Sequence, residues 1–120
     1  MADQSPTVDY YQTNDGRQPF REWLNTLGDR RALAKIDARI TRRRAGLKGD
    51  WKGVGEGVQE LRIDFGPGYR LYIGQDGTQL FLLLCGGDKG SQSADIEKAK
   101  AYWADYKTRK KEANDNAIKK

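Results

Sequence analysis

The feature that most constrains this chain is a set of three strand-like segments separated by short glycine turns. In residues 58–65 and 69–73 every second side chain is apolar, which is the period of a half-buried strand. Turn sequences at residues 66–68 and 76–77 join these segments to each other and to residues 78–85, which are apolar on both faces. The pattern predicts three consecutive antiparallel strands, the third buried on both sides.

Two helices are predicted before these strands. Phe20 and the apolar residues that follow it at helical spacing form a short amphipathic helix that ends at Gly28. Asp29 is suited to cap a second helix that runs to about residue 44. We expect its apolar stripe to consist of Leu33, Ile36 and Ile40.

The remaining segments complete the expected order of elements. Residues 7–12 predict a first strand, and residues 46–57, with five glycines, predict a loop. After Ser91 or Ser93, either of which could cap it, a last helix is expected. Its apolar stripe would be Ile96, Ala99, Trp103 and Tyr106.

The predicted class is therefore α+β, in the order β-α-α-β-β-β-α, with an antiparallel sheet and the helices packed on one face. Residues 1–107 would form a single domain, and residues 108–120 a basic, flexible tail, since the apolar pattern fades there. The other face of the sheet would then be bare and would present Arg62 and Arg70.

Composition excludes several kinds of chemistry. The chain has no histidine and one cysteine, so it offers no zinc site of the usual kind and no Ser-His-Asp or Cys-His mechanism. We expect no metal and no cofactor, and we interpret Cys85 as a buried small residue rather than a nucleophile. No apolar run is long enough for a membrane span, and residues 1–16 lack the basic residues of a signal peptide, so we expect a cytoplasmic protein without membrane contacts.

The net charge of +5 is unevenly distributed. Residues 17–70 hold 13 basic and 7 acidic residues, and residues 98–120 hold 8 and 3. Residues 1–16 and 71–97 are both acidic overall. Two basic blocks predict a partner rich in phosphate, although lysine and arginine also simply keep small proteins soluble.

The candidate site follows from the predicted hairpin. Alternation places Arg62 and Arg70 on the same uncovered face, where two guanidiniums could grip phosphate oxygens. Loop lysines could reach the rim of this face, namely Lys48, Lys52 and Lys89. The alternative is that both arginines form ordinary cross-strand ion pairs with Glu60 and Asp64, and Arg62 is the better candidate for that structural role.

A second basic surface is predicted along the second helix. Its arginines would bind RNA, unless they only form a solvated helix face; those singled out are Arg39, Arg42, Arg43 and Arg44. Trp51 either stacks on a base or fills the glycine-rich loop. Trp23 and Trp103 are predicted to be core residues.

Several motifs resemble the RelE/ParE toxin superfamily, in particular its HigB-like branch of addiction-module killer proteins. They cover about residues 8–107: Phe20-Arg21-Glu22-Trp23-Leu24, Lys48-Gly49-Asp50 with Lys52, Glu60-Leu61-Arg62, Gly66-Pro67-Gly68-Tyr69-Arg70, and Leu84-Cys85-Gly86-Gly87-Asp88-Lys89 followed by Ser91-Gln92 and Asp95-Ile96. The predicted order of elements agrees with that family's fold.

The resemblance implies a ribosome-dependent, metal-independent endoribonuclease that an antitoxin holds inactive. Arg70 corresponds to the arginine that grips the scissile phosphate, while Lys48, Lys52 and Lys89 correspond loosely to its basic residues. The tyrosine that RelE-type toxins carry at the start of the last helix has no counterpart, and Ile96 lies near that place. Without histidine, a lysine whose pKa neighbouring cations lower would act as the base on the ribose 2′-OH.

The resemblance also implies partners. The antitoxin in this branch is a small helix-turn-helix DNA-binding protein, and operator DNA would be bound only through it. Two other functions stay open: a ParE-like inhibitor of DNA gyrase, and a non-catalytic module that only binds RNA or its antitoxin.

Overall fold

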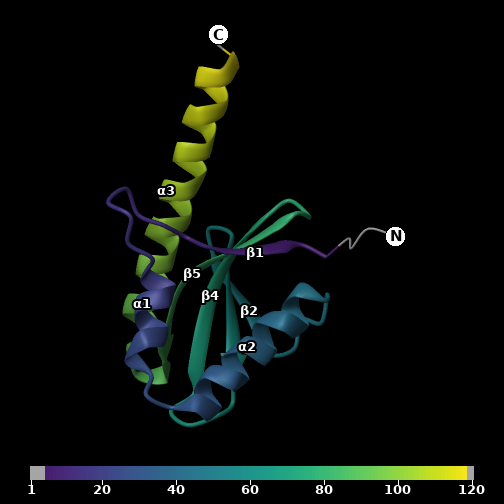
Figure 1. Ribbon diagram of the computed structural model, residues 1–120, viewed down its shortest axis with the longest axis vertical. Coiled ribbons are helices and arrows are strands. Elements are labelled where there is room, and N and C mark those ends of the chain that lie inside the picture. Colours follow the sequence, from purple (N-terminus) through teal and green to yellow (C-terminus); the bar gives the residue numbers. More distant parts are fainter. Residues whose placement is uncertain (1–4, 119–120) are drawn as a thin grey trace.

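A computed structural model of the chain describes residues 5–118. The strands are β1 (Thr7–Tyr10), β2 (Trp51–Gly55), β3 (Val58–Ile63), β4 (Tyr69–Asp76) and β5 (Leu80–Asp88). The helices are α1 (Pro19–Thr26), α2 (Arg30–Arg44) and α3 (Gln92–Ile118), with a short 3-10 turn, η1 (Lys89–Ser91), before α3. The predicted α+β class is confirmed (Figure 1).

The sheet is open, mixed and five-stranded, in the order β1-β5-β4-β3-β2. Strands β2 to β5 are antiparallel neighbours, whereas β1 runs parallel to β5. The prediction of a purely antiparallel sheet is therefore wrong. It also missed β2, which lies within the predicted loop of residues 46–57 and pairs with β3 through a bulge at Gly53 and Gly55.

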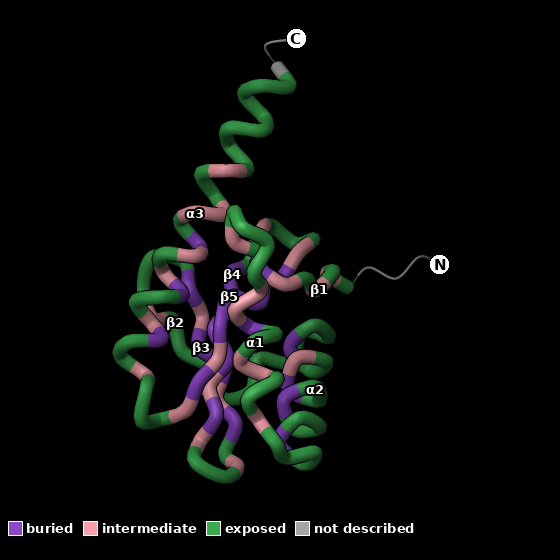
Figure 2. Tube along the Cα trace, turned by 60° about the vertical axis from the view of Figure 1, so that its left-hand side comes forward, coloured by how far each residue is buried: buried purple, intermediate pink, exposed green. Residues whose placement is uncertain are grey.

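Helices cover both faces of the sheet, so the prediction of one covered face is wrong. The face under α1 and α2 forms one core cluster, which includes Phe20, Ile36 and Leu71. The opposite face packs against α3 in a second cluster, which includes Tyr72, Leu84 and Trp103. The reason lies in β5, whose residues Phe81–Cys85 are buried and supply apolar side chains to both clusters (Figure 2).

Helix α2 begins as predicted, because the Asp29 carboxylate accepts hydrogen bonds from the backbone N–H groups of Arg31 and Ala32. Its buried side differs from the prediction. Ala32, Ile36, Arg39 and Arg43 are buried, whereas Leu33 is exposed. The inward-facing stripe of α2 is thus half arginine.

Helix α3 continues to Ile118, well past the end expected near residue 107, and its last turns project beyond the sheet (Figure 1). Contacts to the body hold its middle part. The Tyr106 hydroxyl and the Lys110 ammonium both donate to the Asp76 carboxylate, and Arg109 donates to the Gln12 carbonyl and to Asp105. No helix in residues 5–118 is long and apolar enough to cross a membrane.

Strand β1 lies at one edge of the sheet, and its outer side is blocked. The backbone N–H groups of Thr7 and Tyr11 point to β5. The backbone N–H and C=O groups of the even-numbered residues therefore point away from the sheet. Pro6 has no N–H, and its carbonyl accepts from Arg44 Nε at 2.6 Å. The Tyr10 N–H donates to the neighbouring Asp9 carboxylate at 2.8 Å.

Candidate functional site

The sheet register brings the two predicted site arginines together. Arg62 on β3 lies directly opposite Arg70 on β4, and Arg70 lies opposite Gly87 on β5. Directly opposed residues share a face, with Cβ atoms about 4.5–5.5 Å apart. This face is the one that α3 covers, so the arginines lie beside the first turn of α3 rather than on a bare sheet.

A buried carboxylate organises this end of the sheet. Glu60, opposite Tyr72, is fully buried. Its Oε1 accepts from Arg62 Nε at 2.9 Å, and its Oε2 accepts from the Tyr72 hydroxyl at 3.0 Å and from Gln92 Nε2 at 2.9 Å. The three donors belong to β3, β4 and α3, so this carboxylate joins two strands and one helix.

The Arg62–Glu60 pair confirms part of the alternative interpretation of the arginines. Arg62 has the structural partner that the sequence favoured for it. Asp64 is exposed and does not pair with Arg70. Arg70 therefore does not take part in an ion pair of the predicted kind.

Arg70 is the least satisfied polar group of the site. Its Nε and Nη1 atoms are buried and, within residues 5–118, have no hydrogen-bond partner, although the residue as a whole is partly exposed. The charge of Arg70 does act on Glu60, where it favours the ionised carboxylate. A guanidinium carries five donors in a fixed fork. Arg70 thus has unused donor capacity next to Arg62.

The titratable groups of the site are held away from neutral pH. Burial opposes ionisation of Glu60, but hydrogen bonds from Arg62, Gln92 and Tyr72 outweigh it and hold the pKa of that carboxyl below its usual range. Burial and the Glu60 charge raise the pKa of Tyr72 far above its usual value. Burial raises the pKa of Cys85 to about 12, in agreement with its predicted role as a buried, inert residue.

The predicted lysines do not all converge. Lys52 on β2 lies opposite Glu60, on the face of the arginines. Lys89, which follows β5, lies beside the turn between β3 and β4. A Cβ atom added to Gly68 of that turn would be 3.8 Å from the Cβ of Lys89. Lys48 is placed differently: its Nζ lies 5.0 Å from the centre of the Trp51 ring, and Trp51 points to the opposite face of β2 from Lys52. Lys48 and Lys52 are both predicted at the rim of the arginine face, and only Lys52 lies on that face.

The predicted RNA-binding surface of α2 is only partly available. Arg39 and Arg43 are buried and bond to the protein itself, so the prediction that they contact RNA is wrong for the structure as it stands. Arg42 is exposed, and Arg44 donates to the Pro6 carbonyl. Trp51 remains 39% exposed and does not fill the loop. Trp103 is buried and Trp23 packs against the first cluster, which confirms both as core residues.

Sequence reasoning missed the residues that join α3 to the site. Gln92, the first residue of α3, reaches Glu60, and Asp95 accepts from the Ser91 hydroxyl. Gly87 makes this approach possible, because a Cβ atom there would lie 1.9 Å from Asp95 Oδ2. The spacing of Gly87, Ser91, Gln92 and Asp95 was a signal only through the family resemblance, since no periodicity links them.

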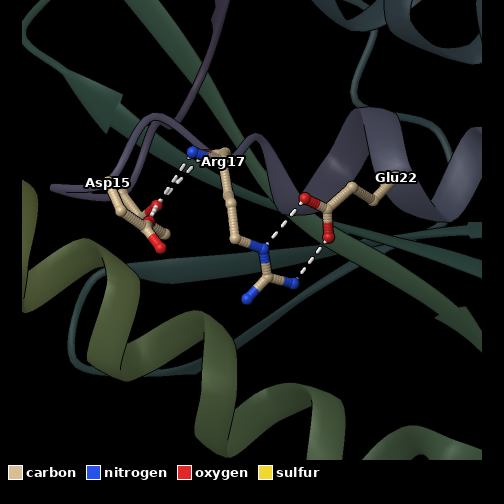
Figure 3. Close-up of polar contacts among 4 residues, drawn as sticks. Asp15, Arg17 and Glu22 are labelled. Atoms are coloured by element: carbon tan, nitrogen blue, oxygen red, sulfur yellow. Dashed lines mark hydrogen bonds and ion pairs between the residues drawn. The ribbon is translucent and has the colours of Figure 1, made fainter.

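A cleft of about 440 Å³ adjoins the site between α1 and α3. Gly86 and Gly87 form part of its floor, Asp95 and Lys98 line one wall, and Trp23 lines the other. Arg17, which lines this cleft, donates two hydrogen bonds to the Glu22 carboxylate, from Nε at 3.1 Å and from Nη2 at 2.7 Å (Figure 3). Within residues 5–118 no cluster of histidine, cysteine or acidic residues is arranged to hold a metal ion.

Comparisons with known proteins place the chain in a family without giving it an activity. No family model matches the sequence. A protein of Haemophilus influenzae (strain Rd), described as an uncharacterized protein, is 52% identical over 81 residues, which is 68% of this chain and 82% of that protein. At this identity and coverage, the chain belongs to the same protein family as the Haemophilus influenzae protein.

Proposed function

We propose that this protein is the toxin of a type II toxin–antitoxin pair, an endoribonuclease that cuts messenger RNA on the ribosome, with the sheet topology of the RelE/ParE superfamily. One observation carries the proposal. Arg70 is partly exposed, two of its guanidinium nitrogens lack hydrogen-bond partners within residues 5–118, and it lies directly across from Arg62 at the end of the sheet. Phosphate oxygens are the acceptors that such paired guanidiniums suit best.

The reaction would use the nucleophile that RNA already carries. The ribose 2′-oxygen attacks the phosphorus, the bond from phosphorus to the 5′-oxygen breaks, and a 2′,3′-cyclic phosphate and a 5′-hydroxyl result. Arg70, with Arg62 behind it, stabilises the negative charge that develops on the phosphoryl oxygens. One such donor is worth about 3 kcal/mol, or roughly a hundredfold in rate.

Proton transfer falls to lysines. A neutral lysine amine accepts the 2′-hydroxyl proton, and a lysine ammonium protonates the leaving 5′-oxygen. Lys52 and Lys89 are the candidates, because Lys52 lies on the arginine face of β2 and Lys89 lies beside the Gly68 turn that precedes β4. Lys48, which stacks on Trp51, would contact RNA further along the β2 edge. The ribosome would align the RNA, and orientation of this kind can contribute about 7–11 kcal/mol.

The proposal includes partners and place. A small helix-turn-helix antitoxin would bind the toxin and, with it, the operator DNA. The chemistry needs no metal and no cofactor, and the protein would act in the cytoplasm, where its single buried cysteine suits a reducing environment.

One observation favours a second candidate, a module that binds RNA or its antitoxin without cutting. The pKa shifts at the site keep Glu60 ionised and Tyr72 and Cys85 neutral, so none of these groups is poised to exchange protons near pH 7. A site of this kind can hold a phosphate without breaking its ester bond.

The test is expression of the wild type, Arg70→Ala and Arg21→Ala in bacteria, followed by mapping of mRNA 5′ ends. Arg21 is an exposed arginine on α1 whose guanidinium lies over Tyr10, away from the site. Cuts within translated frames that persist in Arg21→Ala and disappear in Arg70→Ala support the endoribonuclease. Binding of ribosomes without cuts supports the module, and gyrase-linked DNA breaks would reject both.

A further inference from the structure

The segment that begins β2 is fastened to the body by one buried side chain. Arg39 of α2 is 3% exposed. Its Nη2 donates to the carbonyls of Lys48 and Asp50, the latter at 3.1 Å, and its Nε lies 3.4 Å from the carbonyl of Arg62. The guanidinium therefore joins a helix, the loop before β2 and the end of β3.

The backbone of the loop is shaped around this guanidinium. Gly49 has a φ of +59°, and a Cβ atom there would lie 3.1 Å from both Cζ and Nη2 of Arg39. Only glycine combines that left-handed conformation with so close an approach. The Asp50 carbonyl also accepts from the Arg62 N–H at 2.9 Å, so it is shared between Arg39 and the strand of the site.

Arg39 is also chemically out of place as a core residue. It occupies a position on α2 at which helical spacing after Ala32 and Ile36 calls for an apolar side chain. Its hydrogen-bond partners are backbone carbonyls, and its Nη1 is buried without a partner within residues 5–118. A buried guanidinium is costly unless its bonds are needed.

We propose that Arg39 is a positioning residue, which fixes Lys48 and the start of β2, the strand that carries Lys52, relative to Arg62 and Arg70. This inference rests on the proposed function, because it names what holds two segments of that site in register. Arg39 itself touches no substrate. Its role is to set the distance of Lys48 and Lys52 from the two arginines of β3 and β4.

The first measurement is hydrogen exchange on the full chain, which does not depend on activity. In Arg39→Met, amides of residues 48–53 should exchange at least roughly tenfold faster, while amides of β5 keep wild-type rates. Gly49→Ala, which keeps the arginine but crowds it, should have the same local effect. The control is Arg43→Met, which removes an equally buried arginine one turn further along α2, bonded to Gln59 rather than to the loop. Equal exchange at residues 48–53 in Arg39→Met and wild type would overturn the proposal.

The second measurement is the rate of mRNA cutting on saturating ribosomes. Arg39→Met should lower that rate at least tenfold with little change in the half-saturating ribosome concentration, and millimolar guanidinium ion should restore part of it. Fast loop exchange with wild-type cutting would overturn the positioning role. A wild type that binds ribosomes but never cuts would refute the proposed function and leave the exchange result to decide whether Arg39 holds the loop.

Discussion

Two pairs of arginines on opposite faces of the sheet show how differently one residue type can be used. Arg39 and Arg43 lie under α2, where carbonyls, the Gln59 amide and the Phe81 ring surround them. Arg62 and Arg70 lie on the other face, partly exposed, around the Glu60 carboxylate. The first pair is buried and bonds to the chain's own backbone and core, whereas the second pair is partly exposed and can reach a ligand. Burial and partner type, not charge, separate the two pairs.

The largest effect expected from this comparison is on activity at Arg70. Arg70→Ala should reduce mRNA cutting by roughly a hundredfold or more, about 3 kcal/mol of transition-state stabilisation, because a phosphate-directed donor is lost. Its melting temperature should stay close to that of the wild type, since the two buried nitrogens have no protein partner to lose. Cutting at wild-type rates would remove Arg70 from the site.

Glu60 should show the next largest effect, on stability. Glu60→Gln keeps the shape but turns an acceptor into a donor against Arg62 or Gln92, which should lower the free energy of unfolding at pH 7 by about 2 kcal/mol. Urea unfolding of the two proteins measures this difference.

The same pair of proteins tests the pH dependence. The pKa of Glu60 in the folded state lies below its usual value of 4.5, so its ionised form stabilises the fold fully above that value. As the pH falls through the lowered pKa, this contribution is lost. The difference between wild type and Glu60→Gln should therefore shrink as the pH falls below 4.5 and through the lowered pKa of Glu60. A difference that grows over this range would mean that the carboxylate is not stabilised by folding.

Arg43 should have a smaller effect on the free energy of unfolding, and whether its replacement stabilises or destabilises the fold tests how the buried pair differs from the partly exposed pair. Arg43→Met removes a buried charge that lies 4.6 Å from the Phe81 ring centre and replaces it with an apolar side chain of similar length. Replacing buried charges with apolar groups is often neutral or stabilising, so the free energy of unfolding should change by less than about 1.5 kcal/mol. A much larger loss would show that the bond to Gln59 anchors α2 to β3.

The smallest effect is expected at Asp76, which holds the middle of α3. Asp76→Asn weakens the contacts to Tyr106 and Lys110, one of which is a partly exposed ion pair. Such pairs contribute about 0.2–1 kcal/mol, and thermal unfolding should show a loss in that range that high salt reduces. Insensitivity to salt would indicate that the Tyr106 hydrogen bond carries the contact.

The strands that carry the site could be predicted because their pattern is local. The alternation in β3 and β4 and the turn between them predict that Arg62 and Arg70 share a face, and the structure places them directly opposite each other. Strand β2 could not be predicted, since its glycines carry no strand pattern and its register comes from pairing with β3. The two apolar faces of β5 pointed to cover on both sides, but the charged residues of β3 and β4 on the α3 face led to the expectation of a bare surface there.

The arginines of the candidate site could be predicted from the sequence, but the residues that hold them in place could not. Residue type and alternation predict the two arginines, whereas Lys52 is expected only as a loop residue near the rim. Glu60 was considered only as an ion-pair partner, and its bonds to Tyr72 and Gln92 depend on the tertiary position of α3. Helical spacing could not show that Arg39 and Arg43 point inward, because long charged side chains are ordinarily placed in solvent.

The parallel pairing of β1 with β5 has a consequence for the order of folding. Thr7 aligns with Leu80, so the first strand to leave the ribosome must wait for more than half of the chain before its partner exists. Contacts this distant in sequence form late and slow the folding of small domains. Until residues 79–83 are made, the N–H groups of Thr7 and Tyr11 that later bond to them have no strand to pair with, which leaves this side of the segment open to a foreign strand. On the other side, the missing N–H of Pro6 and the Asp9 carboxylate beside the Tyr10 N–H reduce the backbone groups on offer.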